Sequence, residues 1–213
     1  MQRLRLKFGR GEELKFLSHL DLMRLWERAL RRAGLPLAYS EGFTPHPQIA
    51  LAAPLLVGVT SDAELMDVSL SRWVSPQSFM AQIEKQLPLG ITLLEAKPVG
   101  QNVPSLQSQV KFVEYTVEVE TEKEHQEVES DLVSFLSKKE LPWHHHRDTG
   151  DRYYDLRALV DDLRLTDCHD SICVLEMRLR CDEKGAGRPE QVTKALGFSK
   201  RPKSIHRTNL ILV

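Results

Sequence analysis

Two histidines stand in one stretch that could do chemistry, FLSHLDLMRLWERALRRAGLPLAYSEGFTPHPQIALAAPLLVGV. His19 follows Ser18 and falls in the first turn of an expected helix, where backbone amides and the helix dipole favour a bound phosphate. His46 lies between two prolines in a polar turn, from which an imidazole could reach a phosphate. The two could also serve as acid and base in RNA cleavage. The alternative for His19 is packing on its own core, because a helical wheel places it beside Trp26 and Leu30.

Arginines form a basic row on the same expected helix. Arg24, Arg28 and Arg31, with Arg32 beside them, lie on the arc opposite the apolar stripe. A planar guanidinium presents a fork of donors to phosphate oxygens, so the row is a candidate phosphate-contacting ridge. A solvated helix face explains the same residues without any ligand.

The turn after the helix, SEGFTPHP (Ser40–Pro47), has the composition of a stiff loop. Gly42 permits unusual backbone angles, and the two prolines fix theirs. Stiffness lowers the ordering entropy that a binding loop loses when it meets a ligand. We expect Phe43 to stack on a base and His46 to contact a phosphate. The alternative is a structural turn whose Phe43 fills the core.

A second basic segment, SKRPKSIHR (Ser199–Arg207), contains no acidic residue. Its Lys200, Arg201 and Lys203 are candidate phosphate contacts or the charges of a soluble loop. The glycine-rich EKGAGRP before the next expected helix has neither GxxxxGK[ST] nor GxGxxG. We interpret it as a flexible loop and not as a nucleotide site.

Metal-binding patterns are absent from the sequence. Cys168, Cys173 and Cys181 match no zinc or iron–sulfur spacing, and their odd number argues against a disulfide framework, so we expect reduced thiols. WHHH (residues 143–146) places at most His144 and His146 on one side of a strand, with no third ligand nearby. The sequence therefore predicts no metal site.

Composition is that of a soluble protein with one large domain or two small ones. The 213 residues are 41% hydrophobic and 28% charged. No apolar run approaches the roughly 20 residues that span a bilayer. The start, MQRLRLKFGRG, lacks the h-region of a signal peptide, so we expect a cytoplasmic protein.

Charge is distributed unevenly along the chain. Residues 1–50 hold nine Lys/Arg against five Asp/Glu, and residues 51–140 hold seven against fourteen. Residues 182–213 hold seven against three. The basic ends favour an anionic partner such as nucleic acid, or they average out on the folded surface.

The elements that position the histidines and arginines follow the order βαββαβ through residue 99. Alternation predicts a strand over 3–8, and Ser18 with Asp21 caps a helix that ends near Ala33. Strands at 47–55 and 63–70, a helix at 75–88 and a strand at 90–99 follow. This order is typical of a ferredoxin-like half, with four antiparallel strands and two helices on one face.

The second part of the chain repeats this order. A polar stretch at 101–109 predicts a linker. A strand, a helix at 123–140, strand-like segments, a helix at 188–198 and a last strand follow, with an inserted element near 153–165. The sequence thus predicts an α+β fold of two ferredoxin-like halves in tandem, residues 1–100 and 110–213.

The long stretch quoted first resembles the DUF2344 family, also called the radical-SAM-associated family. The shared features are the FLSHLD start, the basic helix and the Gly-Phe turn with its prolines. The resemblance is strong over residues 3–70 and continues through YDLRALV and RPEQVTKALG. It implies a protein that accompanies a large radical-SAM protein or forms its C-terminal domain, in a gene neighbourhood with an endoribonuclease and ribosomal proteins. Because this chain has no CxxxCxxC motif, the iron–sulfur cluster and S-adenosylmethionine are expected on that partner, and no cofactor on this chain.

These observations favour a non-catalytic accessory module of a radical-SAM enzyme that binds RNA or a ribosome-related substrate. The candidate binding residues are His19, Arg24, Arg28, Arg31, Phe43, His46, Lys200, Arg201 and Lys203. One alternative is a metal-independent endoribonuclease that uses His19 or His46, by analogy with the architecture of Cas6-like endoribonucleases. The other is a protein–protein scaffold without RNA affinity, whose acidic middle docks a basic partner.

Overall fold

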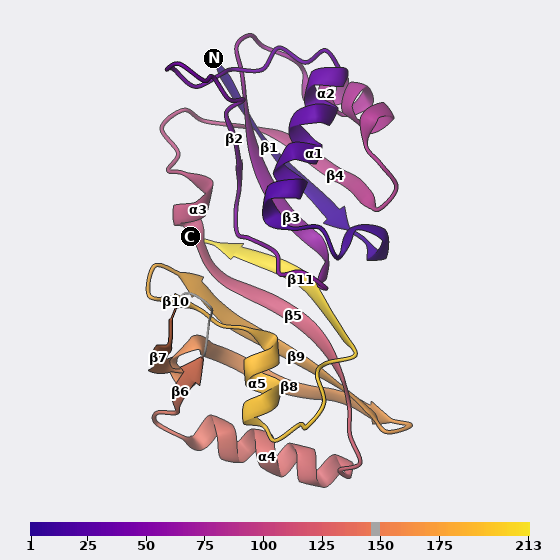
Figure 1. Ribbon diagram of the computed structural model, residues 1–213, viewed down its shortest axis with the longest axis vertical. Coiled ribbons are helices and arrows are strands. Elements are labelled where there is room, and N and C mark those ends of the chain that lie inside the picture. The colour runs from indigo at the N-terminus through magenta and orange to yellow at the C-terminus, as the bar shows by residue number, and fades with distance from the viewer. Residues whose placement is uncertain (146–149) are drawn as a thin grey trace. The chain divides into compact units, whose positions relative to one another are not determined.

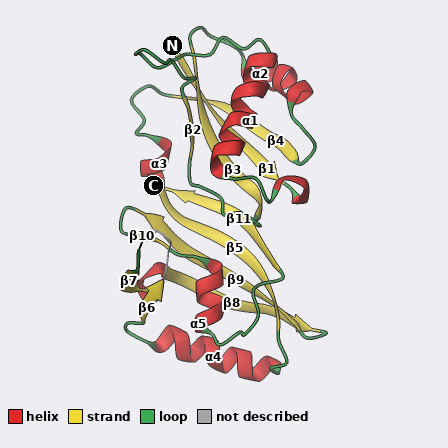
Figure 2. Ribbon diagram, viewed as in Figure 1, coloured by secondary structure: helices red, strands yellow, loops and turns green. Residues whose placement is uncertain are grey.

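A computed structural model describes residues 1–145 and 150–213 and divides the chain into two compact units. Unit 1 comprises residues 1–110 and Val213, and unit 2 comprises residues 111–212. Each unit is a mostly antiparallel sheet with helices packed on it (Figure 1, Figure 2). The predicted α+β class is confirmed. Within the described ranges, no helix is long and apolar enough to cross a membrane.

Unit 1 has four strands in the order β4–β1–β3–β2, and each pair is antiparallel. The strands are β1 (Gln2–Arg10), β2 (Ile49–Leu51), β3 (Thr60–Leu70) and β4 (Ile91–Val99). The helices are η1 (Glu12–Leu14), α1 (His19–Arg32), α2 (Pro76–Ile83), η2 (Glu84–Gln86) and α3 (Leu106–Gln109). Residues 101–109, where the sequence predicts a linker, hold α3 and belong to unit 1, with Leu106 buried.

Helix α1 begins and ends where the sequence predicts. The Ser18 hydroxyl oxygen accepts from the Asp21 backbone N–H at 3.2 Å and donates to the Asp21 carboxylate at 2.7 Å. The chain leaves the helix through Gly34 at φ +67°, a backbone angle that favours glycine. Trp26 meets Phe8 of β1 edge-on, with ring centroids 4.8 Å apart. The buried face of α1 holds Leu22, Trp26, Ala29 and Leu30, and it leaves the arginines on the outer face.

A buried arginine fixes the chain at the start of α1. The Arg10 guanidinium donates to the carbonyl oxygens of Leu56 at 2.9 Å and Val59 at 2.8 Å. It also reaches the carbonyl oxygens of Lys15 and Leu17 at 3.4 Å. One cation therefore donates to carbonyl groups of two loops and joins these loops in the interior.

A second buried arginine forms an ion pair on the sheet. Arg5 of β1 donates through Nε and Nη2 to the two carboxylate oxygens of Asp67 on β3, at 2.7 and 3.0 Å. Both side chains are less than a tenth exposed. The bidentate geometry matches the guanidinium fork to the carboxylate and joins neighbouring strands.

Unit 2 repeats the strand order of unit 1, as β11–β5–β9–β8. The strands are β5 (Val110–Glu120), β6 (Pro142–His145), β7 (Arg152–Asp155), β8 (Val160–His169), β9 (Ile172–Asp182), β10 (Gly185–Ala186) and β11 (Ser204–Leu212). The helices are α4 (His125–Ser137), η3 (Arg157–Leu159) and α5 (Pro189–Ala195). Alternate residues of β5 face buried partners on β9, for example Val117 opposite Leu175. β6 and β7 form a separate two-stranded sheet that precedes η3 and β8.

The prediction of three reduced thiols is wrong for two of the cysteines. Cys168 of β8 lies opposite Cys173 of β9, with Cα atoms 4.0 Å apart, and the two form a disulfide. Cys181 takes no part in it. The hairpin register brings the two sulfur atoms together, and the spacing of the cysteines alone does not show this register.

Candidate nucleic-acid interface

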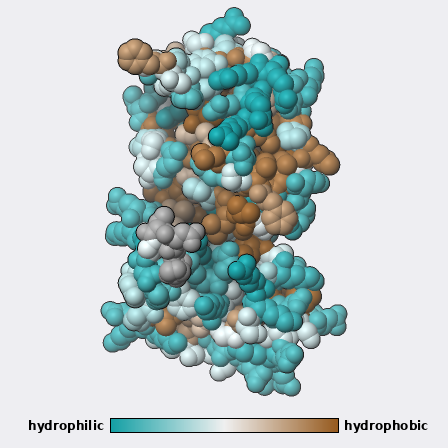
Figure 3. All heavy atoms as spheres, viewed as in Figure 1, coloured by the Kyte–Doolittle hydropathy of each residue, from teal (hydrophilic) through white to brown (hydrophobic). Residues whose placement is uncertain are grey.

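The arginine row lies on the exposed face of α1. Arg24, Arg28 and Arg31 are all exposed, and Figure 3 shows hydrophilic residues gathered over this helix. Arg24 makes an exposed ion pair with Asp21, with Nη1 and Oδ1 3.6 Å apart. Arg31 lies over the ring of Tyr39, with its guanidinium carbon 5.9 Å from the ring centroid. The arginine row therefore ends at the ring of Tyr39, a residue that the sequence analysis did not select.

Arg32 differs from the other three arginines. Its Nη2 donates to the Gln86 carbonyl oxygen at 3.0 Å, which ties the end of α1 to η2. This bond gives Arg32 a structural role within unit 1, so we leave it out of the candidate interface.

The loop after Tyr39 is closed by its own backbone. The Ser40 N–H donates to the His46 carbonyl oxygen at 2.9 Å, and the His46 N–H donates to the Ser40 hydroxyl oxygen at 3.1 Å. Gly42 sits at φ +122°, which a residue with a side chain rarely adopts. Phe43 is fully exposed at the loop and does not fill the core. A large apolar ring held in water by a closed loop is available for stacking.

We call the exposed arginines and the loop residues together the basic–aromatic surface of unit 1. Its members are Arg24, Arg28, Arg31, Tyr39, Phe43 and His46. Tyr39 could have been found from the sequence, since it stands immediately before the stiff loop. In the structure it closes this loop through a β-bridge with Pro47.

His19 lies at the other end of α1. It is the first residue of the helix, half-buried, and its buried Nδ1 has no hydrogen-bond partner among the described residues. Arg31, which contacts Tyr39, lies 12 positions further on, or about 18 Å along the axis at 1.5 Å per residue. In Figure 1 the loop between α1 and β2 leaves from the far end of the helix. The structure therefore does not bring His19 and His46 together, as an acid–base pair acting on one bond requires.

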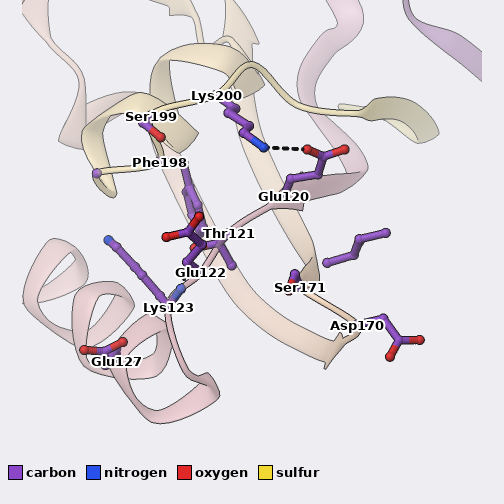
Figure 4. A pocket seen from close by; sticks show the side chains of 12 residues that line it. Glu120, Thr121, Glu122, Lys123, Glu127, Asp170, Ser171, Phe198, Ser199 and Lys200 are labelled. Carbon is purple, nitrogen blue, oxygen red and sulfur yellow. Dashed lines mark hydrogen bonds and ion pairs between the residues drawn. The ribbon is translucent and has the colours of Figure 1, made fainter.

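The basic C-terminal residues belong to unit 2, where Lys200 lines a cavity of about 620 Å³ (Figure 4). The lining includes four acidic residues, Glu120, Glu122, Glu127 and Asp170, against the two lysines Lys123 and Lys200. Both lysines are engaged within the unit. Lys200 Nζ meets Glu120 Oε2 at 2.9 Å, and Lys123 Nζ meets Asp131 Oδ2 at 2.6 Å. The excess of carboxylates makes this cavity a poor site for a phosphate.

The Lys200–Glu120 contact changes the titration of both groups. The hydrogen bond and charge of Lys200 lower the pKa of the Glu120 carboxyl, and those of Glu120 raise the pKa of the Lys200 ammonium. Each group is therefore held in its charged form over a wider pH range.

The other two basic residues of this segment, Arg201 and Lys203, are exposed and lie outside the cavity lining. The backbone N–H of Lys203 donates to the Glu118 carbonyl oxygen at 2.8 Å.

A metal site finds no support in the part of the chain that the structure describes. No group of three or more His, Cys, Asp or Glu side chains there could hold an ion. His144 pairs with Asp151, with Nε2 and Oδ2 3.0 Å apart. His146, the other histidine expected on that side of the strand, lies outside the described residues.

Comparisons with known proteins give a family and a fold. Residues 3–189 match the family described as "Uncharacterized protein conserved in bacteria (DUF2344)". A search of curated proteins found no match.

Among solved structures, a Cbf5–Nop10–Gar1 complex is similar over 97% of this chain and 48% of its own chain, at a TM-score of 0.55 and 8% identity. The archaeal box H/ACA sRNP Nop10–Cbf5 complex is similar over 96% of this chain and 46% of its own chain, at a TM-score of 0.50 and 8% identity. An H/ACA RNP bound to a substrate RNA containing 2'-deoxyuridine is similar over 97% of this chain and 46% of its own chain, at a TM-score of 0.50 and 9% identity. The chain thus spans just under half the length of the chains it resembles, and at this identity the likeness concerns the fold alone.

Proposed function

The chain belongs to the DUF2344 family, and from this premise we propose that it binds single-stranded RNA through the basic–aromatic surface of unit 1. The likeness to H/ACA complexes, one of them bound to a substrate RNA, agrees with an RNA-related role. Because that likeness is one of fold, the proposal rests on the surface itself.

The observation that carries the proposal is the exposed Phe43 on a closed loop that follows Tyr39, the ring that Arg31 covers at the end of the arginine row. Proteins that bind single strands combine cations that follow the backbone with aromatic rings on which bases stack. Arg24, Arg28 and Arg31 supply the cations, and Phe43 supplies the ring. Because cations that follow the backbone and a ring that stacks on any base do not distinguish base edges, we expect binding with little sequence preference.

The test is the affinity of Phe43→Ala for a labelled single-stranded oligonucleotide, measured by fluorescence anisotropy. Loss of one stacked base weakens binding by about tenfold or more. Phe16→Ala is the matched control, because Phe16 is also highly exposed in unit 1 but lies near η1, outside the surface. Equal affinities of the two variants, or of Phe43→Ala and the unaltered protein, would remove the loop from the proposal.

The proposed role is non-catalytic. On this view the RNA stays intact during binding, in buffer with or without EDTA. Cleavage that persists in EDTA and is lost in a folded His19→Ala or His46→Ala variant would favour the ribonuclease alternative instead. His19 stands at the start of α1 and His46 in the loop beyond the far end of this helix, and this separation is the reason for preferring binding.

We also propose that the protein acts in the cytoplasm as an accessory of a radical-SAM enzyme, with the iron–sulfur cluster and S-adenosylmethionine on that partner. The resemblance of FLSHLD and the Gly-Phe turn to the radical-SAM-associated family supports the pairing. Co-purification of the two proteins, with and without ribonuclease treatment, tests it. Failure to co-purify under both conditions would refute the pairing and leave the RNA-binding proposal standing.

Finally, we propose that the two units are ferredoxin-like halves in tandem. The equivalent strand orders β4–β1–β3–β2 and β11–β5–β9–β8 support this proposal. So does the position of α1 and α2 in unit 1, and of α4 and α5 in unit 2, in the connections between the strands. An experimental structure that gave either unit a different strand order would contradict it.

A further inference from the structure

A basic cavity of unit 2 lies apart from the surface proposed above. Its volume is about 240 Å³, and its walls come from β7, from η3 and from the segment around β10. Three of the side chains that line it are cations, Arg152, Lys184 and Arg188, and one is an acid, Asp155. All of these residues belong to unit 2, whereas the basic–aromatic surface belongs to unit 1.

The three cations are not used by the fold in ion pairs. Within residues 1–145 and 150–213, no acidic side chain pairs with Arg152, Lys184 or Arg188. The Asp155 carboxylate serves the backbone instead, because its Oδ1 accepts the N–H groups of Leu141 at 2.8 Å and of residue 157 at 2.9 Å. The cavity therefore holds three positive charges against one negative charge, and this excess favours an anion of more than one charge.

The β7 wall of the cavity holds an arginine against an aromatic ring. Arg152 and Tyr154 are two positions apart on β7 and so project from the same face of the strand. The Arg152 guanidinium carbon lies 5.9 Å from the centroid of the Tyr154 ring. The ring is fixed in turn, because the Tyr154 hydroxyl donates to the Gln191 side-chain oxygen on α5. A guanidinium that already rests on a fixed ring loses less freedom when it binds an oxyanion.

The opposite wall depends on two glycines. A Cβ added at Gly185 would lie 2.8 Å from the Leu159 side chain, and one at Gly187 would lie 3.1 Å from the Leu159 carbonyl oxygen. Only glycine lets this segment pack against η3 without a shift. The stretch that the sequence indicates as a flexible loop is thus a close-packed turn that carries Lys184 and Arg188 to the cavity.

This wall also supplies a backbone donor. The Gly187 N–H donates to the Arg180 carbonyl oxygen at 2.9 Å, so these two residues form a hydrogen-bonded pair of the β9–β10 ladder. Ala186 lies opposite Cys181 in the next pair, where the N–H groups point away from the partner strand. Because β10 is the last strand of the sheet, the N–H of Ala186 is directed away from β9 at an open edge. Ala186 itself lines the cavity.

We propose that this cavity is a site for the phosphate group of a phosphate monoester. Such a group carries close to two negative charges at neutral pH and has three acceptor oxygens. These properties match the excess of positive charge and the donor forks of Arg152 and Arg188. A phosphodiester of a nucleic-acid backbone carries one charge and matches the cavity less well. A small phosphorylated molecule and the 5' end of an RNA strand present the same monoester group.

Equilibrium dialysis of the full chain against radiolabelled inorganic phosphate tests the site. We expect saturable binding that methyl phosphate displaces and that dimethyl phosphate, with its single charge, displaces far less well. The double variant Lys184→Ala/Arg188→Ala should bind phosphate about tenfold or more weakly, because it loses hydrogen bonds from charged donors. Arg188→Lys keeps the charge without the fork, so its affinity should lie between those of the unaltered protein and the double variant.

The matched control is Lys138→Ala/Lys139→Ala, which removes the same charge from exposed positions just after α4. Absence of saturable phosphate binding up to millimolar concentration overturns the proposal. So does an equal loss of affinity in the control, or equal displacement by the two methyl esters. Circular dichroism confirms that each variant is folded. If the double variant does not fold, Arg152→Ala replaces it, since Arg152 stands on the other wall of the cavity and should weaken binding in the same way.

The two sources of the phosphate group are distinguished with RNA in the Arg24→Ala/Arg28→Ala/Arg31→Ala background. Binding of a 5'-phosphorylated strand that a strand without this phosphate does not show, and that Arg152→Ala weakens, supports the site with a strand end as its ligand. Binding of methyl phosphate without such a preference for the phosphorylated strand supports the site with a small phosphorylated molecule as its ligand. Because the dialysis uses no RNA, its failure is separate from a failure of the RNA-binding proposal.

Discussion

Replacement of Arg24, Arg28 and Arg31 by alanine should flatten the salt dependence of RNA binding. The three residues span seven positions of α1, or about 10 Å, so each can reach a different phosphate. Each phosphate contact to a single strand contributes about 0.7 to the slope of log K against log salt, so three contribute about 2. From about 50 to about 200 mM salt, the unaltered protein should therefore lose about 16-fold more affinity than the triple variant.

The exposed ion pair of Arg24 with Asp21 changes this expectation little. Exposed pairs are worth about 0.2–1 kcal/mol, so Asp21 can give way to a phosphate. Fluorescence anisotropy at several salt concentrations gives the slopes. The matched control is the triple variant Lys97→Ala/Lys138→Ala/Lys139→Ala, which removes the same charge from exposed positions on β4 and just after α4. An unchanged slope would refute the proposal that these three arginines contact phosphates. The same flattening in the control would also refute it, because the effect would then come from the net charge of the protein.

Three further predictions concern stability and titration. Asp67→Ala should lower the free energy of unfolding by about 3–5 kcal/mol, because it leaves the buried Arg5 charge without its carboxylate. Urea unfolding measures this loss, and a loss below about 1 kcal/mol would contradict the prediction. Trp26→Ala should cost about 3–5 kcal/mol in the same assay, since the fully buried indole leaves a cavity next to the sheet. Lys200→Ala should raise the pKa of the Glu120 carboxyl toward its ordinary value, and a carboxyl titration by NMR that shows no change would refute the pairing. Because the folded pKa of Glu120 is lowered, the pair stabilises the fold above the unfolded pKa, and this contribution is lost as the pH falls through the folded pKa.

Local signals in the sequence determine the main elements of this protein. The start and end of α1 follow from Ser18, Asp21 and Gly34, which act on backbone groups within a few positions. The α+β class follows from the alternation of strand and helix periods along the chain. The stiffness of the 40–47 loop likewise depends on its own prolines, Pro45 and Pro47, so the sequence alone indicates a loop able to present Phe43.

The tertiary structure alone decides which distant residues meet. Lys200 is engaged by Glu120, 80 positions away, because β5 and β11 are neighbours in the sheet. Strand register likewise joins Cys168 to Cys173, and chain packing brings Lys184 and Arg188 beside Arg152. The physical reason is that helix caps and hydrophobic periods depend on near neighbours, whereas strand order, register and close packing depend on the whole folded unit. For this protein, the candidate side chains can be named from the sequence, but only the fold shows which of them remain available to a ligand.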